Sequence, residues 1–355
     1  MTELKASLLW ELQQAIPLES EPFHIIGVRL GISAAEVLEL TRKLMDEGKV
    51  RRVGAVFDAR RLGYRSALCA VDAPAAELER VAAFVCAHRG VTHGYERGWP
   101  ADLAPNVPGG PDGRHWPRFW FTLATEREIF EQEMADVRRA VEPYPLLVLP
   151  ALKRFKIDVT FDPRTLDRDE SVPVPKVPGA VVPAIVRGGD ATAAQKDLTF
   201  TEQDRAIVRA LEGNLPLVER PYAAVASLLG LAESALLERL NSWSAQGVLR
   251  RMALIVYHRK LGFVANGMCV WDVPESEITE AGRRVAAHPA VTHCYQRGRS
   301  DIFPFTLYAM IHTGSWAGTS QLFKEIGDSA GLTHTQGQLL LSLREFKKTS
   351  MTYFQ

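Results

Sequence analysis

Two short segments of this chain hold the same three polar side chains at the same spacing. Residues 91–98 are VTHGYERG and residues 291–298 are VTHCYQRG. Arginine binds carboxylates through paired hydrogen bonds, tyrosine adds a donor, and histidine exchanges a proton near neutral pH or ligates a metal. Alternate side chains of a strand share one face. We therefore expect two convergent trios: His93, Tyr95 and Arg97, and His293, Tyr295 and Arg297.

The trios also have a purely structural interpretation. Each histidine would cap a turn, and each arginine would be a solvated edge residue. Recurrence of the pattern favours a functional role, although common descent of the two segments would by itself preserve it.

Further cations precede or follow each trio. The adjacent pairs Arg51-Arg52 and Arg250-Arg251 lie in predicted strands. Neighbours on a strand face opposite ways, so at most one arginine of each pair should enter any one pocket. Lys156 and Lys347 are weaker candidates near the ends of the two halves. The alternatives are contacts to DNA phosphate for the arginines and a charged surface edge for the lysines.

The remaining histidines, which include His258 and His312, are isolated in the sequence and indicate no site. The four cysteines show no C-x-x-C spacing, so we expect no zinc or iron–sulfur site. No G-x-G-x-x-G follows a predicted strand, which argues against a nicotinamide or flavin site.

Composition narrows the class of protein. The 355 residues contain 42 Lys plus Arg and 42 Asp plus Glu, so the formal net charge is zero. Proteins that bind nucleic acid through a broad charged surface usually have an excess of basic residues. Sparse cysteines fit a reducing compartment. The chain shows no signal-peptide pattern and no run of about 18 apolar residues, so we expect it to be cytoplasmic and to have no membrane segment.

The similarity between the halves extends far beyond the trios. For example, Leu62-Gly63-Tyr64 is matched by Leu261-Gly262-Phe263. The repeated unit is too long for a solenoid, whose repeats run roughly 20–50 residues. The duplication therefore predicts a fused dimer, in which a pocket between related halves can carry two similar but unequal sets of polar groups.

Each half is predicted to begin with a helix-turn-helix and a strand-like wing. Ser33-Ala34-Ala35-Glu36 is a capping box that begins a helix, and Gly48 ends it. Leu236, Leu240, Trp243 and Gly247 repeat the arrangement. The wings are expected at 50–57 and 248–257.

After each wing the predicted order is strand, helix, strand, strand, helix, strand, which is that of a ferredoxin-like unit. Its helices should cover one sheet face and leave the other free for a partner or ligand. The last strands are expected at Leu152–Phe161 and Leu343–Phe354. The fold class is therefore α+β, with two tandem repeats that each join a winged helix-turn-helix domain to a ferredoxin-like α/β sandwich domain. The expected boundaries are 1–60, 61–162, a Pro/Gly linker at 163–197, 198–259 and 260–355.

Two features bear on the choice of function. Residues 99–118 form a loop rich in proline and glycine that is far shorter in the second half. It is either a lid over a pocket or a tolerated surface insertion. The predicted recognition helices carry acidic residues such as Glu36, Glu39 and Glu238. These would meet phosphate repulsion, so we do not expect DNA binding.

Two resemblances follow from these motifs. Residues 52–58 (RVGAVFD), followed by Leu62-Gly63-Tyr64, resemble the wing and effector-domain entry of the Lrp/AsnC regulators. Residues 216–222 (PLVERPY), both VTHxYxR strands, Phe155-Lys156 and residues 344–348 (REFKK) resemble the siroheme decarboxylases. The first half is similar to the D-type subunit and the second to the L-type, so the chain looks like a D–L fusion.

The resemblance implies a carboxy-lyase of haem d1 biosynthesis. Such an enzyme removes the acetate carboxyls at C12 and C18 of siroheme and yields 12,18-didecarboxysiroheme. The resemblance places the tetrapyrrole between the two effector-type domains and makes histidines essential. It implies no added cofactor and no resident metal, since the iron belongs to the substrate. The implied partners are siroheme or a related iron-porphyrin and, beyond it, other haem d1 biosynthesis enzymes.

The candidate residues suit this chemistry. Siroheme bears eight carboxylates, and loss of an acetate carboxyl leaves carbanion-like charge that must be protonated. We expect His93 and His293 to donate protons or orient the reacting acetates, while the arginines and tyrosines fix the macrocycle. The rival hypotheses are a ligand-responsive regulator and a non-catalytic tetrapyrrole carrier with a histidine on iron. One pocket or two, and further homodimerisation, stay open.

Overall fold

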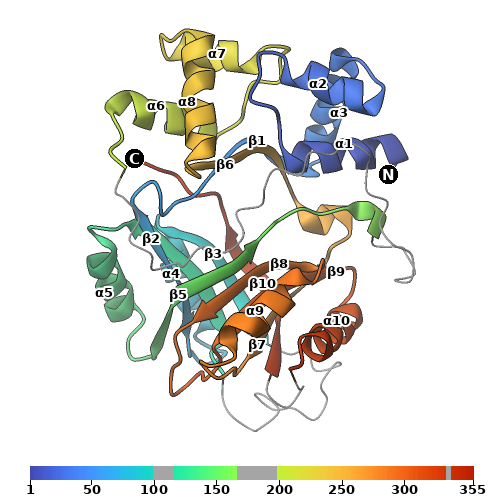
Figure 1. Cartoon of the computed structure of the whole chain (residues 1–355). Coiled ribbons are helices and arrows are strands. Elements are labelled where there is room, and N and C mark those ends of the chain that lie inside the picture. Colours follow the sequence, from blue (N-terminus) through green and yellow to red (C-terminus); the bar gives the residue numbers. More distant parts are fainter. Residues whose placement is uncertain (99–115, 166–197, 333–336) are drawn as a thin grey trace.

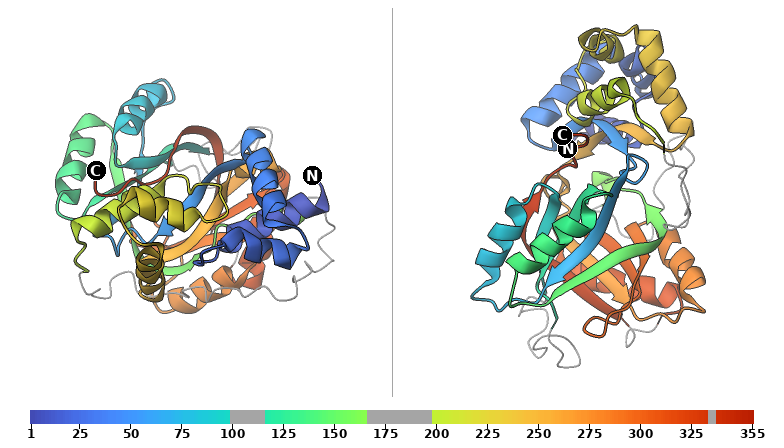
Figure 2. Two further views of the ribbon diagram at one scale, coloured as in Figure 1. Left: turned by 90° about the horizontal axis from the view of Figure 1, so that it is seen from above. Right: turned by 90° about the vertical axis from the view of Figure 1, so that its left-hand side faces the viewer.

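The computed structural model describes residues 1–98, 116–165, 198–332 and 337–355. It has two layers, with the helix-turn-helix regions of both halves above and a β-barrel below (Figures 1 and 2). The predicted loop at 99–118 and the predicted linker at 163–197 fall mostly outside the described residues. No described helix is long and apolar enough to cross a membrane.

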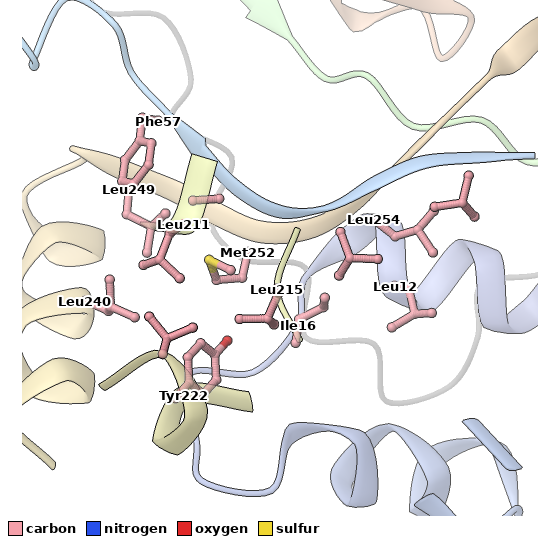
Figure 3. Close-up of a cluster of buried hydrophobic side chains, with 14 of the residues drawn as sticks. Leu12, Ile16, Phe57, Leu211, Leu215, Tyr222, Leu240, Leu249, Met252 and Leu254 are labelled. Carbon is pink, nitrogen blue, oxygen red and sulfur yellow. The ribbon is translucent and has the colours of Figure 1, made fainter. Parts of the chain in front are cut away.

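The helical layer contains three helices from each half: α1 (Glu3–Gln14), α2 (Pro22–Leu30), α3 (Ala34–Asp46), α6 (Glu202–Glu212), α7 (Pro221–Leu228) and α8 (Glu233–Ala245). The predicted capping box is confirmed at α3, where Ser33 Oγ accepts from the Glu36 amide at 3.2 Å. Gly48 follows α3 in the left-handed region with φ 65°, which glycine adopts without steric cost. An apolar cluster from both halves, including Leu12, Leu211 and Tyr222, joins this layer to the strands below it (Figure 3).

The predicted wings form one shared structure. Strands β1 (Val50–Phe57) and β6 (Leu249–Val256) pair with each other in antiparallel fashion, so neither is a hairpin within its own half. We call this pair the β1–β6 ribbon. Its register shifts once in each strand, at Arg51 and at Arg250. The ribbon lies between the helical layer and the barrel (Figure 1).

The two ferredoxin-like sheets close into a single barrel. Their strands are β2 (Tyr64–Val71), β3 (Val91–Gly98), β4 (Phe119–Glu126), β5 (Leu146–Ile157), β7 (Ala265–Trp271), β8 (Val291–Arg297), β9 (Leu307–Thr313) and β10 (Gly337–Lys348). The order around the barrel is β10-β3-β4-β2-β5-β8-β9-β7. Each half supplies four consecutive strands in ferredoxin-like order. The halves meet at the β5–β8 and β10–β3 pairs.

Four helices cover the outside of the barrel: α4 (Leu78–Ala87), α5 (Phe130–Ala140), α9 (Ile278–Ala287) and α10 (Trp316–Ser329) (Figure 1). Each half also has an apolar core between its sheet and its helices. The sheet face expected to be free is therefore the interior of the barrel.

The predicted bounds of the last strand are wrong in both halves. Strand β5 begins at Leu146 rather than Leu152, and β10 begins at Gly337 rather than Leu343. The early part of each strand pairs with the first strand of its own sheet, and the later part pairs with the other half. Only the later part carries the charged segments 153–156 and 344–348.

Candidate active site

A cavity of about 820 Å³ lies between the barrel interior and the β1–β6 ribbon. Both trios line it, so the structure brings His93, Tyr95 and Arg97 together with His293, Tyr295 and Arg297. The two trios therefore face one shared space. An aromatic and aliphatic cluster that includes Trp120, Phe303 and Met268 packs within the barrel, and Trp120 and Met268 also contribute apolar walls.

The lining is strongly cationic although the whole chain is neutral. Its cations are Arg51, Arg52, Arg97, Arg154, Arg250, Arg251, Arg297 and Lys348. Asp158 is the one carboxylate among the described lining residues. A cavity lined by one sign of charge concentrates ligands of the opposite sign. The site is therefore suited to a ligand with several negative groups.

All four wing arginines line this cavity, which corrects the expectation that at most one of each pair would. The reason is the bulge in each ribbon strand, at Arg51 and Arg250. A bulge places two residues opposite one partner residue and breaks the strict alternation of side chains. Arg51 and Arg52 both donate to Ser350 Oγ, at 2.9 and 3.2 Å.

Lys156 and Lys347 are not among the lining residues, which corrects their assignment to the substrate site. Lys156 Nζ donates to the His288 carbonyl oxygen at 3.0 Å, and Lys347 Nζ donates to the Cys86 and His88 carbonyl oxygens at 2.7 and 3.0 Å. These carbonyls lie at the ends of α9 and α4. Both lysines thus satisfy free carbonyls at a helix C-terminus, where a cation is favourable.

Several buried donors beside the cavity have no partner within the described residues. They are Arg52 Nη1, Arg97 Nε, Arg251 Nε, Arg297 Nε and Tyr308 Oη. Buried polar groups are nearly always hydrogen-bonded, and an unpaired one needs an explanation. A polyanionic ligand in the cavity would supply acceptors for these donors.

The two trios have nearly the same geometry. The Nδ1 atom of each histidine lies against the preceding threonine Oγ1, at 2.9 Å for His93 and 3.1 Å for His293. The histidine and tyrosine ring centroids are 6.3 Å apart in both. Each arginine stacks over its own tyrosine, at 5.3 Å for Arg97 and 5.0 Å for Arg297.

Burial and positive neighbours keep both trio histidines neutral. Burial, followed by the charges of Lys348 and Arg51, lowers the pKa of His93 to about 3. Burial, followed by Arg250 and Arg297, lowers the pKa of His293 to about 4. Carboxylates that enter the cavity would offset these cations and raise both pKa values. Ligand binding and histidine protonation are therefore coupled.

The surroundings of the trios differ. Near His293, Asp58 Oδ2 accepts from Arg154 and Arg250 at 3.0 and 3.1 Å. Burial alone would raise the pKa of Asp58, but Arg250, Arg60 and Arg154 hold it well below its usual range. In the repeat, Tyr257 stands in place of Asp58 and Glu345 in place of Arg154. The second half thus has no counterpart of this acid-centred cluster.

A second cluster has no counterpart in the first half. His258 and His312 line the cavity with ring centroids 5.0 Å apart, and Phe161 contacts both rings. Lys348 Nζ lies 2.9 Å from His258 Nδ1. Burial and Lys348 lower the pKa of His258 to about 3, and burial lowers the pKa of Lys348 to about 8.

Comparison with known proteins identifies the family. The AsnC-like ligand binding domain matches residues 61–156 and 260–347. The siroheme decarboxylase NirDL-like HTH domain matches residues 5–51 and 204–250. A siroheme decarboxylase of Hydrogenobacter thermophilus is 37% identical, over 97% of this chain and 92% of that protein. The chain belongs to the siroheme decarboxylase family.

Two solved structures of this family match nearly the whole chain. The siroheme decarboxylase NirDL is 32% identical with a TM-score of 0.69, over 99% of this chain and 95% of that one. Its complex with an iron-uroporphyrin III analogue gives a TM-score of 0.67 at the same identity and coverage. The predicted fused decarboxylase architecture and the fold class are thus confirmed.

Sequence reasoning did not assign several polar lining residues to the site, among them Arg154, Lys348, His258 and His312. Arg154 and Lys348 adjoin register shifts in β5 and β10, which the pattern of side chains does not reveal. The two histidines are far apart in sequence and meet because β7, which follows His258, pairs with β9, which carries His312. Among the described residues, no group of three or more His, Cys, Asp or Glu side chains could hold a metal ion.

Proposed function

We propose that this chain is a siroheme decarboxylase that removes the C12 and C18 acetate carboxyls of siroheme and forms 12,18-didecarboxysiroheme for haem d1 biosynthesis. The observation that carries the proposal is the single cavity that holds two His-Tyr-Arg trios among eight cationic side chains. Family membership supports the same substrate, because a related NirDL protein binds an iron-uroporphyrin III analogue.

The cavity fits a tetrapyrrole in size and in chemistry. About 820 Å³ lies in the upper part of the range of about 300–1,000 Å³ for small-molecule sites. Trp120, Met268 and Met310 offer apolar surface to the macrocycle. The arginines can pair with its peripheral carboxylates through two parallel hydrogen bonds each. Orientation of the macrocycle then places two acetates beside the two histidines.

Each decarboxylation needs one proton. The bond between the carboxyl carbon and the methylene carbon breaks, carbon dioxide leaves, and the electron pair stays on the methylene carbon. A proton on that carbon completes the methyl group. We assign the two donors to His93 and His293, each acting from the Nε2 atom that faces away from its threonine. Iron remains part of the substrate.

Carboxylate binding should belong to Arg97, Arg297 and the four ribbon arginines, with Tyr95 and Tyr295 as further donors. The unpaired guanidinium nitrogens of Arg52, Arg97, Arg251 and Arg297 support this role. Lys348 and Arg154 join the set because both line the cavity. We further propose that the chain acts in the cytoplasm, where its four free cysteines would stay reduced.

The test is anaerobic incubation of the purified chain with siroheme, followed by mass analysis of the tetrapyrrole. Loss of two carboxyl groups supports the proposal. Tight binding without loss of carbon dioxide would identify a carrier instead. Specific, salt-dependent DNA binding without turnover would identify a regulator.

A further inference from the structure

Two walls of the cavity lie between the trios, one on each side. In the order of the barrel strands, β4 and β2 separate β3 from β5 and β8, while β9 and β7 separate β8 from β10 and β3. The duplication relates these two walls to each other, just as it relates His93 to His293. A cavity with equal walls would therefore bind an unsymmetrical ligand in two equivalent orientations. The two orientations would exchange the group beside His93 with the group beside His293.

At three matched positions the two walls carry side chains of very different size. We call Ala59, Ser66 and Ala124 of the first half the small-residue wall. We call the corresponding His258, Asn266 and His312 of the second half the histidine wall. The ladders support this correspondence, because Ser66 pairs with Ala124 and Asn266 pairs with His312. All six residues line the cavity, so the cavity is wider on the side of the first half.

The neighbouring ladder pairs that face the barrel interior are far more equal in size. They are Leu68 with Thr122 and Ala70 with Trp120 in the first half, and Met268 with Met310 and Val270 with Tyr308 in the second. The loss of one bulky side chain is offset there by a larger partner. The two walls show no such compensation, so the difference in shape lies at their three matched positions.

The histidine wall is held in place by its own contacts. The Asn266 amide nitrogen lies 2.7 Å from His312 Nε2. Phe161 contacts the rings of His258 and His312, with centroids 5.2 and 5.0 Å from its own. Lys348 Nζ lies 2.9 Å from His258 Nδ1. These contacts keep the three side chains from turning aside to make room for a ligand.

We propose that the tetrapyrrole binds in one orientation, against the small-residue wall, because the histidine wall fills the equivalent space in the second half. The inference rests on the proposed function, since it states which wall of that same site the substrate meets. The small side chains leave room for part of the flat macrocycle. The histidine wall excludes the orientation that the duplication would otherwise allow, and specificity often depends on such a steric block. Each reacting acetate then meets one fixed histidine.

The charges beside the trio histidines add a second difference between the two orientations. Lys348 is the ladder partner of His93, whereas Ile157 is the ladder partner of His293. Both partners line the cavity. A carboxylate beside His93 therefore meets a cation that a carboxylate beside His293 does not. Shape and charge thus both distinguish the two orientations.

Exchange of residues between the walls tests where the macrocycle lies. The double variant Ser66→Asn/Ala124→His copies the histidine wall onto the first half and should weaken binding of iron-uroporphyrin about tenfold or more, because the added atoms occupy the space of the ligand. Ala124→Leu adds bulk without a polar group and should act in the same direction, whereas Ala124→Ser should stay within about twofold. His258→Ala/His312→Ala removes bulk where the ligand does not lie, so its affinity should stay within about threefold. Titration followed by absorption measures all four.

The orientation itself can be measured from one turnover of siroheme by a chain with one intact trio. His93→Ala should give one monodecarboxylated isomer. His93→Ala combined with His258→Ala/His312→Ala should give both isomers in comparable amounts, because the macrocycle can then bind in either orientation. His288, which lies at the end of α9 and does not line the cavity, provides the control. His93→Ala combined with His288→Gln should still give the single isomer.

Unaltered affinity in both Ser66→Asn/Ala124→His and Ala124→Leu would overturn the inference, and so would a tenfold loss of affinity in His258→Ala/His312→Ala. A single isomer from the combined His93 variant with the opened histidine wall would overturn it as well. The isomer ratio does not depend on affinity, so it decides the question even where a bulky variant folds poorly. If the unaltered chain releases no carbon dioxide from siroheme, the proposed function fails. The binding comparison still tests the position of the macrocycle in that case, so the two failures are distinct.

Discussion

The His93 trio and the His293 trio lie on equivalent strands of the cavity wall, but two clusters of side chains near them occur only once. The histidine–threonine, histidine–tyrosine and arginine–tyrosine contacts agree within a few tenths of an ångström. Near His293, Arg154 and Arg250 both donate to Asp58. The second half also supplies the pair of contacting rings of His258 and His312. At the repeat positions that correspond to His258 and His312, the first half has Ala59 and Ala124.

This difference shows which features the duplication retained. The trios lie on strands whose alternation is fixed by the sheet, so both copies keep one geometry. The flanking positions face the same cavity but are free to change, since an alanine and a histidine both fit there. Two similar acetates of one substrate can thus meet His93 and His293, two equivalent histidines whose neighbouring side chains differ.

The largest expected effect at one end is loss of the Asp58 cluster. Asp58→Asn leaves Arg154 and Arg250 buried without their carboxylate, and breaking such a pair costs about 3–5 kcal/mol. Tyr257→Phe, at the matching position of the second half, should cost under about 1.5 kcal/mol. Urea unfolding measures both. Equal losses of unfolding free energy in the two variants would mean that the Asp58 cluster does not distinguish the two ends of the cavity.

The trio arginines should contribute equally to substrate binding. Arg97→Ala and Arg297→Ala each remove charge-assisted hydrogen bonds worth about 1.5–3 kcal/mol, or roughly 10–150-fold in affinity. Titration with iron-uroporphyrin checks this. A large effect at one arginine and none at the other would show that the macrocycle sits against one trio only.

Acid should destabilise the ligand-free protein through the buried histidines of the cavity. The pKa values of His93, His258 and His293 in the folded chain, about 3, 3 and 4, lie below the unfolded value of about 6.5. As the pH falls below about 6.5, the unfolded chain takes up protons that the folded chain does not. Each histidine then lowers the free energy of unfolding by up to about 1.4 kcal/mol per pH unit.

Thermal unfolding from pH 7 to pH 4.5 measures this dependence. The slope should shrink when iron-uroporphyrin is bound, because its carboxylates raise the histidine pKa values. It should shrink more in the variant that lacks His258 and His312 than in His93→Ala, since two histidines of lowered pKa are removed instead of one. An unchanged slope in all variants would contradict the neutral, buried histidines described above.

The smallest effects belong to Lys156 and Lys347. Lys156→Met and Lys347→Met remove cations from helix ends, which should cost about 0.3–1 kcal/mol each. Affinity for iron-uroporphyrin should stay unchanged for both. A tenfold loss of affinity in either variant would return that lysine to the substrate site.

Much of the site could be predicted because the histidine, tyrosine and arginine of each trio occupy alternating strand positions. The trios, the capping box at Ser33 and the ferredoxin-like order all depend on local patterns. The sequence did not predict that all four ribbon arginines line one cavity, since the bulges at Arg51 and Arg250 break the alternation of side chains without a sequence signal. His258 and His312 could not be predicted, because their contact depends on the pairing of β7 with β9, which brings the segment before β7 against the end of β9.

The most direct test of the two-ended site is single-turnover decarboxylation of siroheme by His93→Ala and His293→Ala. Each variant should stop at a monodecarboxylated product, and the two products should be different isomers. Full removal of both carboxyls by both variants, or the same isomer from each, would contradict it.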